Sequence, residues 1–570
     1  MLFGILFCFI AATAHLLICI TIFESISRSK QMVGTAISFD VRRRASAARQ
    51  TDVLVIGGGP AGVWAALTAA ERGARVILAE KGLVGTGGAT AAGNTTTIYA
   101  GPSSLEREAA IKRRLHHAQD VADRRWIERV IDESYVRLNQ LADWGYRFPV
   151  DQLGQSYRGS LRGADYLRFM RRRLRKAGVE VLDQSPALEL LRDSDGAAAG
   201  AVGVNRLTNE VWTVHAGAIV IASGGCAFLS GALGTNGLTG DGLLMAAEAG
   251  ASFSGMEFAG QYGISPAFAS VTKGIMYFWA TFTDEDGNEL PGEGDRQGIV
   301  ARQLLKGRCF AVIDKASPYL QQGMRVGQPN MFIAFDRTGI DPFKQRFEVT
   351  LRYEGTVRGP GGLSINDDGA TSVTGLYAAG DAASRENMVG AASGGGGPNA
   401  TWALSSGIWA GRAAAEFAAR LGGNHHLRER RPLGQAGLRP GSEVRSSLDA
   451  RDVIRVTQNE ILPIAKTFFR REEQLRRSLN VLDDAWTAAS GEFAAAHLPA
   501  SELVRAREAA AMLAAARWVV ASGLERHETR GLNRRLDHPV KNPALARRLF
   551  TGGLERVWVS PEAQLRALAS

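Results

Sequence analysis

Residues 51–81 read TDVLVIGGGPAGVWAALTAAERGARVILAEK, and this stretch decides the fold. An apolar run from Val53 to Ile56 ends at a glycine-rich turn, an alanine-rich helical pattern follows, and a second apolar run from Val76 to Ala79 ends at Glu80. The order of strand, glycine turn, helix, strand and acid is typical of a dinucleotide-binding unit. A glycine turn that binds nothing is the alternative, and the presence of both strands, the helix and the acid disfavours it.

The residues of the glycine turn have separate expected roles. Gly57 permits the tight turn, Gly59 lets the backbone approach a pyrophosphate, and Gly62 lets the helix pack close to the strand. The N-terminus of the helix presents free N–H groups and a partial positive charge to the phosphates. Glu80 can accept hydrogen bonds from a ribose diol.

The composition limits the classes of protein and of site. The 570 residues suffice for more than one domain, and 45% hydrophobic with 22% charged residues is an ordinary globular balance. The net charge of +10 is compatible with nucleic acid, acidic lipid or anionic ligands, but no nucleic-acid motif accompanies it, so a solvated basic surface is preferred. The four cysteines form no CxxC pair, so we expect no iron–sulfur cluster and no metal site in this chain. The lack of a disulfide framework suits a reducing compartment.

The N-terminal residues 2–23 are almost wholly apolar and long enough for one helix to span a bilayer. They lack a positively charged start and an obvious cleavage site, so they make a poor secretion signal. The positive charges that follow, Arg28 and Lys30 among them, would keep the bulk of the chain in the cytoplasm. Two interpretations stay open: a cytoplasmic protein anchored to the membrane by residues 2–23, or a cytoplasmic protein that starts at Met32.

The pattern of apolar residues divides the rest of the chain. Residues 187–191, 201–206 and 211–215 predict a small antiparallel sheet, and 218–222 predicts a separate buried strand. An aromatic, irregular stretch then indicates an inserted domain. Small residues return near 358, a strand runs into Gly380 and Asp381, and a helix is expected over residues 405–420. The glycines at 394–397 are too many for a helix.

Five motifs in order carry a resemblance to a known family. They are the glycine turn, Thr239-Gly240-Asp241-Gly242, Met256-Glu257-Phe258, Gly375 to Asp381, and Arg526-His527-Glu528-Thr529-Arg530-Gly531 with Arg535-Leu536-Asp537-His538-Pro539. They resemble the FAD-dependent oxidoreductase 2 superfamily, that is, the flavoprotein subunits of succinate dehydrogenase and fumarate reductase, L-aspartate oxidase and adenylylsulfate reductase. The similarity runs from Thr51 to about Pro539.

The resemblance implies an α/β fold with a Rossmann-like FAD-binding domain, an inserted α+β capping domain and a C-terminal helical domain. The expected boundaries are 1–49 for an apolar segment and linker, 50–227 and 357–424 for the two parts of the FAD-binding domain, 228–356 for the capping domain and 425–570 for the helical domain.

The resemblance also implies FAD as the cofactor. Several relatives attach FAD through a histidine after the second strand, but residues 82–97 contain none, so we expect non-covalent binding. The helix expected at 405 would direct its N-terminus at the flavin. The residues expected to bind FAD are Gly57, Gly59, Pro60, Ala61, Gly62, Glu80, Lys81, Thr86, Gly87, Gly88, Ala89, Ala187, Asp241, Gly380, Asp381, Asn399, Leu404 and Ser405.

The substrate half of the family pattern is altered. No histidine follows Met256-Glu257-Phe258, and the family's Thr-Glu pair is Thr272-Lys273 here. A second histidine is replaced by Arg358, one position away, and an expected arginine is missing from 390–399. A site that loses such partners binds its substrate roughly 10⁴-fold less well, so succinate, fumarate and aspartate are disfavoured.

Candidate catalytic residues remain, and for each of the charged ones a plain surface charge is the simpler alternative. Arg296 could deliver a proton if its surroundings lower its pKa. Thr272 is kept from the family pattern. Lys273, Arg296, Arg358 and Arg385 would form a cationic site if they converge, which favours an anionic substrate.

The sequence therefore predicts a FAD-dependent oxidoreductase that transfers a hydride between flavin N5 and an anionic small molecule other than succinate or fumarate. An adenylylsulfate-reductase-like subunit with a ferredoxin-type partner is one alternative, and a flavin electron-transfer subunit without turnover is another. Electrons would pass to or from an iron–sulfur protein, a quinone or oxygen. We expect no nucleic acid as partner.

Overall fold

The computed structural model describes residues 47–150, 154–272, 274–292, 294–393, 396–422, 429–439, 448–492 and 499–561. The apolar segment 2–23 and Lys273 lie outside these residues. None of the described helices is both long and apolar enough to cross a bilayer.

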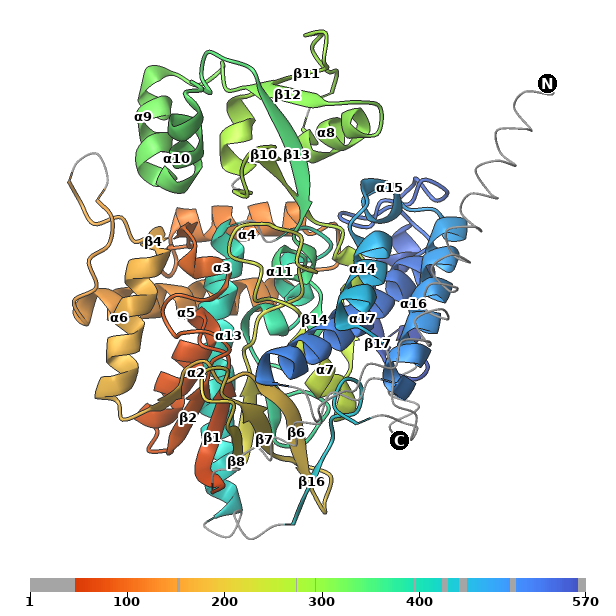
Figure 1. Ribbon diagram of the computed structural model, residues 1–570. Helices are drawn as coiled ribbons and strands as arrows, with labels where there is room; N and C mark the ends of the chain where they lie inside the picture. Colours follow the sequence, from red (N-terminus) through yellow and green to blue (C-terminus); the bar gives the residue numbers. More distant parts are fainter. Residues whose placement is uncertain are drawn as a thin grey trace, which may run out of the picture. The chain divides into compact units, whose positions relative to one another are not determined.

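An eight-stranded sheet forms the base of the fold (Figure 1). Strand β1 (Arg49–Ile56) lies at its centre and pairs in parallel with β2 (Val76–Ala79) on one side and β8 (Val211–Ile221) on the other. β2 pairs in parallel with β5 (Glu180–Leu182), and β8 with β15 (Leu376–Ala378). The buried apolar runs around the glycine turn thus form the parallel strands that their pattern predicts. The α/β class is confirmed.

The antiparallel pairing expected at 187–215 is confirmed, but these strands belong to the eight-stranded sheet and do not form a small sheet of their own. β6 (Ala187–Asp193) and β7 (Ala198–Val204) pair antiparallel and join β8, which runs without a break through both predicted segments 211–215 and 218–222. β16 (Arg430–Pro432) completes the edge. A period-two pattern shows a strand but not which sheet it joins, because pairing partners lie far apart in the chain.

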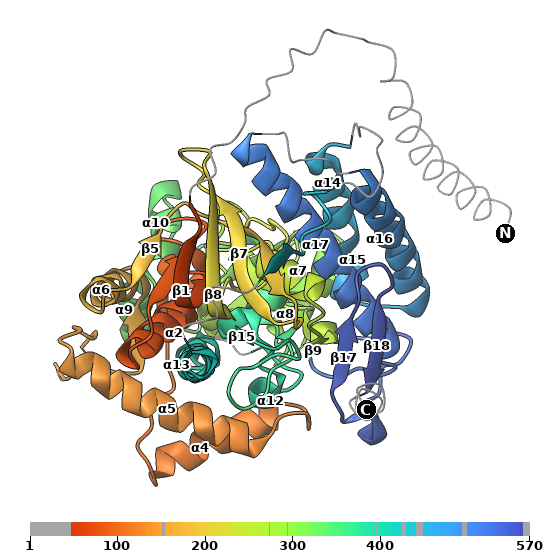
Figure 2. The ribbon, with the colours of Figure 1, turned by 90° about the horizontal axis from the view of Figure 1, so that it is seen from below.

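Helices cover the sheet, and α13 (Gly396–Leu421) packs between β8, α2 (Pro60–Glu71) and α5 (Arg124–Asp143), as Figure 2 shows with α13 viewed along its axis. Two glycines make this packing close. An ideal Cβ on Gly407 would lie 2.4 Å from the carbonyl oxygen of Ala61, and one on Gly411 would lie 2.3 Å from that of Ala65. α4 (Leu105–His117) lies against α5.

A separate antiparallel sheet forms the cap, grouped at the top of Figure 1. Its strand order is β10-β13-β12-β11, and the long connection to β13 carries two successive helices. Its elements are β10 (Tyr262–Pro266), β11 (Thr281–Thr283), α8 (Arg296–Leu304), β12 (Cys309–Val312), α9 (Pro318–Gly327), α10 (Pro329–Thr338) and β13 (Phe347–Tyr353).

The C-terminal region is largely helical and lies to one side of the sheet (Figure 1). α17 (Ala500–Glu525) contacts α14 (Ala450–Ile461), α16 (Glu472–Glu492) and α7 (Asp241–Glu248). β9 (Phe253–Ser254) pairs with β17 (Leu549–Gly552), so the segment before β10 packs against the C-terminal region and not against the cap sheet. The predicted domain boundaries remain predictions, and the cap sheet itself begins at Tyr262.

Candidate functional site

A cavity of about 700 Å³ opens at the carboxyl ends of β1, β2 and β8, where ligands of parallel sheets bind. It is lined by Ile56 and Ala79, the last residues of β1 and β2, and by Ala222, which directly follows β8. The predicted residues that line it are Gly57, Gly59, Pro60, Ala61, Glu80, Lys81, Thr86, Gly87, Gly88, Ala89, Ala187, Asp241, Arg358, Gly380, Asp381 and Asn399.

The glycine turn forms one wall with little room for side chains. Gly57 has φ +110°, a conformation that favours glycine, and an ideal Cβ on Gly62 would lie 1.8 Å from the carbonyl oxygen of Gly57. At Gly59, in contrast, no atom lies within 4 Å of an ideal Cβ. Gly59 is the N-cap of α2 and provides no side-chain cap, so the first N–H groups of α2 are available to an anion in the cavity.

Glu80 and Lys81 stabilise this wall through hydrogen bonds and ion pairs. The Glu80 carboxylate accepts hydrogen bonds from the backbone N–H groups of Gly58 (2.6 Å) and Gly82 (2.8 Å). The Lys81 ammonium lies 2.7 Å from Asp241 Oδ2 and 2.6 Å from Glu508 Oε1. Burial alone would lower the pKa of Lys81, but the two carboxylates outweigh it and raise that pKa. Lys81 therefore stays charged and holds three segments of the chain together.

Another part of the lining carries charged groups from two short helices, α11 (Gly355–Arg358) and η4 (Gly380–Ala382). Arg385 donates to Asp381 Oδ1 at 2.7 Å, and Arg358 Nε lies 3.9 Å from Glu354 Oε1. Glu354 Oε1 also accepts a hydrogen bond of 2.7 Å from Thr272. Burial raises the pKa of Asp381, while Arg385 and Arg358 oppose that rise. The guanidinium groups of Arg358 and Arg385 thus lie close to carboxylates beside the cavity, and they come from separate segments of the chain.

Two of the predicted catalytic residues do not line the cavity. Thr272 is outside the lining and is linked to Arg358 through Glu354, which both residues approach. The guanidinium of Arg296 lies 3.3 Å from the ring centre of Phe278 in the cap. Burial lowers the pKa of Arg296, and Asp295 opposes this. The proton-delivering role of Arg296 stays a prediction.

The helix expected to begin near residue 405 begins at Gly396, so that prediction is wrong. Leu404 and Ser405 therefore lie in the third turn of α13, buried and outside the cavity lining, and Ser405 Oγ donates to the carbonyl oxygen of Val130. The residues that α13 turns to the cavity are Asn399, Ala400 and Ala403. Gly62 also lies outside the lining, where it permits the packing of the turn.

Several lining residues were not predicted from the sequence, among them Ser223, Leu233 and Glu508. Ser223 lies two residues beyond the end of β8, and the rule that ligands bind at the carboxyl ends of parallel strands could have found it. Glu508 lies inside the long helix α17, where no local pattern distinguishes it.

The residues present fit FAD. The cavity is lined by a glycine turn and a helix N-terminus suited to a pyrophosphate, and Asp381 also lines it. Asn399 Oδ1, Asn399 Nδ2 and Ser223 Oγ are buried and have no hydrogen-bond partner in the described part of the chain. Buried polar groups are normally paired, so these three atoms call for a ligand with hydroxyl and amide groups.

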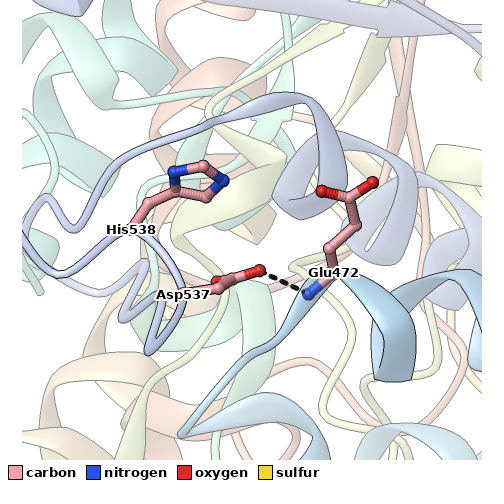
Figure 3. Close-up of side chains that lie close together, drawn as sticks. All are labelled: Glu472, Asp537 and His538. Atoms are coloured by element: carbon pink, nitrogen blue, oxygen red, sulfur yellow. Dashed lines mark hydrogen bonds between the residues drawn. The ribbon is translucent and has the colours of Figure 1, made fainter.

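A second cluster, Glu472, Asp537 and His538, lies outside this cavity (Figure 3). Asp537 Oδ2 accepts a hydrogen bond of 2.7 Å from the backbone N–H of Glu472, and Arg535 donates to both Asp537 oxygens at 2.9 Å. Arg535 holds the pKa of Asp537 well below its usual value. These bonds give Asp537 a structural role, because it links the C-terminal loop to the start of α16.

Comparisons with known proteins agree with this geometry. Residues 52–306 match the model of the FAD binding domain, and residues 460–548 match that of the fumarate reductase flavoprotein C-terminal region. The L-aspartate oxidase of Streptomyces coelicolor is 26% identical over 541 residues, which cover 87% of this chain and 90% of the relative. One polypeptide of the fumarate reductase (CoM/CoB) of Methanothermobacter marburgensis is 25% identical over 369 residues, 58% of this chain and 67% of the relative.

A solved structure shows the same fold. The FrdA protein of E. coli quinol fumarate reductase superposes with a TM-score of 0.75 at 18% identity, over 90% of this chain and 97% of that one. The two family models match in the same order as the motifs of the sequence, and the cavity lies within the fold that they describe. The chain therefore belongs to the superfamily of FAD-dependent oxidoreductases that includes the fumarate reductase flavoproteins and the L-aspartate oxidases.

Proposed function

We propose that this FAD-dependent oxidoreductase acts on an anionic organic molecule other than succinate or fumarate, and that Arg358 binds its negative group. The observation that supports this most is the state of Arg358. Its guanidinium lines the cavity and makes no hydrogen bond with the described residues, and its nearest carboxylate oxygen, Glu354 Oε1, is 3.9 Å away and already bonded to Thr272.

An anion at Arg358 would gain charge-assisted hydrogen bonds in a sheltered place. The Arg358 side chain is 19% exposed, so water competes weakly for its N–H groups. The planar guanidinium can bind a carboxylate or a sulfur oxyanion through two parallel hydrogen bonds. Lys81, another cation of the lining, is occupied by Asp241 and Glu508.

Succinate and fumarate suit this site poorly. The two histidines and the arginine of the family pattern are missing from the sequence, and the family's Thr-Glu pair has become Thr272-Lys273. A site built for two carboxylates that loses such partners discriminates against its former substrate by about 10⁴-fold.

The residues around the cavity would hold FAD without a covalent bond, because residues 82–97 contain no histidine. The bound cofactor supplies two-electron redox chemistry through its flavin ring. The chain's own contribution is to bind the pyrophosphate at the N-terminus of α2, to orient the substrate through Arg358 and to exclude water. Arg296 remains the proposed proton donor, and Thr272 and Lys273 remain proposed substrate-site residues.

For electron exchange we propose an iron–sulfur protein of the ferredoxin type or a quinone. Relatives of this fold include a quinol fumarate reductase and a Mycobacterium smegmatis Sdh1 complex with UQ1. The chain has no CxxC motif that would bind a cluster itself.

The test is an anaerobic screen of the purified, FAD-loaded protein. Organic acids are added to the oxidised protein, and their unsaturated counterparts to the dithionite-reduced protein, while flavin absorbance is recorded. We expect bleaching or reoxidation by an anionic compound, and at least a 100-fold loss of kcat/KM in Arg358→Met with partial recovery in Arg358→Lys. Arg296→Lys should lower kcat while FAD stays bound.

Other outcomes would contradict the proposal in distinct ways. Rapid turnover of fumarate or succinate would show that this protein acts on the family's usual substrates. Bleaching by sulfite with AMP alone would favour an adenylylsulfate-reductase-like activity. If no organic compound changes the flavin absorbance but a ferredoxin exchanges electrons rapidly with the flavin, an electron-transfer subunit would be favoured.

A further inference from the structure

Arg385 is a fully buried guanidinium that joins the two short helices α11 and η4. It donates to Asp381 Oδ1 at 2.7 Å, and its other terminal nitrogen donates to the backbone carbonyl oxygens of Val357 (2.9 Å) and Thr356 (3.4 Å). The Arg385 side chain is 0% exposed and does not line the cavity. It lies outside the lining and bonds groups of both α11 and η4.

The two carbonyls belong to the residues that immediately precede Arg358. α11 is only one turn long, so its own hydrogen bonds hold Arg358 weakly. Arg385 also donates its backbone N–H to the carbonyl oxygen of Pro360, on the other side of Arg358. Arg385, 27 positions away in the sequence, thus bonds the chain on both sides of Arg358, while Cys226 bonds Thr356 and Ser393 donates to the carbonyl oxygen of Arg358.

The same guanidinium neutralises Asp381, a carboxylate of the cavity lining. The Asp381 side chain is 20% exposed, and FAD in the cavity would remove much of that contact with water. A carboxylate that loses water without a paired cation is costly to bury, and it repels the phosphates of FAD. The charged groups that face Asp381 are Arg385 and, more distantly, Arg358 on α11.

We infer that Arg385 is a positioning residue with two separable tasks: its charge makes Asp381 compatible with bound FAD, and its planar fork holds α11 so that Arg358 can bind the substrate anion. The second task rests on the proposed function, whereas the first does not.

Lysine at this position separates the two tasks. The ammonium of Arg385→Lys keeps a positive charge near Asp381, but it lacks the fork that bonds Asp381 through one nitrogen and the two carbonyls through the other. Arg385→Met removes both charge and fork. Asp381→Asn combined with Arg385→Met removes the carboxylate that needs neutralising.

The first measurement is the dissociation constant of FAD from pH 5.5 to 8.5, by titration of the apoprotein and quenching of flavin fluorescence. We expect Arg385→Met to bind FAD at least 10-fold more weakly at pH 8 and to recover toward pH 5.5, because protonation then neutralises Asp381. Arg385→Lys should bind FAD within about 3-fold of the unsubstituted protein. The double variant should lose the pH dependence.

The second measurement is binding of crotonate, a simple organic anion, to the oxidised FAD-loaded protein, read from the flavin difference spectrum at fixed ionic strength. Arg385→Lys should bind crotonate at least 10-fold more weakly, as Arg358→Met does, although its FAD affinity is retained. A purely structural role predicts that both affinities fall together and that the pH profile is unchanged.

Arg517 supplies the matched control. It is equally buried and also bonds one carboxylate, Asp483, and two backbone carbonyls, those of Leu554 and Glu555. Arg517→Met should lower the melting temperature to a similar degree but leave the FAD pH profile and crotonate binding unchanged.

Two results would overturn the inference. One is that Arg385→Met binds FAD as tightly as the unsubstituted protein at every pH, and the other is that Arg385→Lys binds crotonate as tightly as the unsubstituted protein. If the unsubstituted protein itself fails to bind crotonate, the anion site of the proposed function fails and the second task with it. The FAD titration then still decides the first task.

Discussion

Single residues of the glycine turn show how a missing methyl group can serve either the fold or the ligand. Gly62 has a protein atom where a Cβ would stand, whereas Gly59 has open space there and lines the cavity. Gly62 therefore serves packing, and Gly59 leaves space that a ligand can occupy. Both positions are glycine in the motif, so the motif does not distinguish their roles. The distance from an ideal Cβ to the nearest protein atom does.

We predict that Gly62→Ala and Gly59→Ala fail differently. Gly62→Ala forces the Gly57 carbonyl to move and should cost about 3 kcal/mol or more of folding free energy. Gly59→Ala should leave the melting temperature of the apoprotein nearly unchanged and weaken FAD binding at least 10-fold. Thermal melts of both apoproteins and FAD titrations check this. Equal melting temperatures for the two variants would contradict it.

At the scale of elements, the junction between α9 and α10 fastens the cap to the loop beside the cavity. Asn94 Nδ2 donates to the carbonyl oxygen of Gly327 at 2.8 Å, and Asn330 Nδ2 donates to that of Ala92, a lining residue. Asn94 opens β3 (Asn94–Thr96), which follows the short helix α3 (Gly88–Ala91). The two bonds run in opposite directions and so hold the cap against that loop.

We predict that Asn94→Ala with Asn330→Ala loosens this end of the cap. Each hydrogen bond contributes about 1 kcal/mol, so local opening should rise about 5-fold for each bond lost. Hydrogen–deuterium exchange of residues 318–338 is the measurement. Asn288→Ala, which removes a bond to Asp284 inside the cap, is the control and should not change that exchange. Unchanged exchange in the double variant would show that apolar contacts hold the cap instead.

At the scale of the whole molecule, a buried ionic network joins the C-terminal segment to the middle of the chain. Arg526 donates to Glu257 in η2 (Met256–Phe258) at 2.6 Å and to Glu528 at 3.1 Å. Arg548 donates to Glu386 Oε2 at 3.2 Å, while Glu386 Oε1 and Glu257 Oε2 are buried without a partner among the described residues. Burial and the neighbouring Glu257 raise the pKa of Glu386 to about 7, against the effects of Arg548 and Arg526.

This network predicts a pH dependence of stability. The folded pKa of Glu386 lies above its unfolded value, so its contribution is present below about pH 4.5 and is lost as the pH rises through about 7. The loss is on the order of 3 kcal/mol at 1.36 kcal/mol per pKa unit. Glu386→Gln, uncharged at every pH, should be more stable relative to the unsubstituted protein at pH 8 than at pH 5.

Thermal melts from pH 5 to 8 at constant ionic strength measure this difference. Glu416→Gln, at an exposed ion pair with Arg72, is the control and should show none. A stability difference between Glu386→Gln and the unsubstituted protein that does not vary with pH would contradict the prediction.

The sequence by itself determined the first strand–turn–helix–strand unit, the α/β class, FAD as the cofactor and the oxidoreductase class, all of which the family models and the structure confirm. The first unit and the α/β class are readable because they depend on residues a few positions apart: apolar periodicity, glycine in a turn, an acid after a strand. FAD and the oxidoreductase class were implied by the resemblance that the five ordered motifs carry. The start of α13 was misjudged because glycine disfavours helices locally, while packing of Gly407 and Gly411 against α2 stabilises this one.

Only the tertiary structure decided which charges meet at the cavity. Arg358, Asp381 and Arg385 come from two separate segments, and Glu508 reaches Lys81 from more than 400 residues away. Nothing in the local sequence marks Arg385 as the partner of Asp381 and of the Val357 carbonyl, or separates it from the surface arginines. Those pairings depend on how elements distant in the chain pack, because burial and the nearest opposite charge, not residue type, determine what an arginine does.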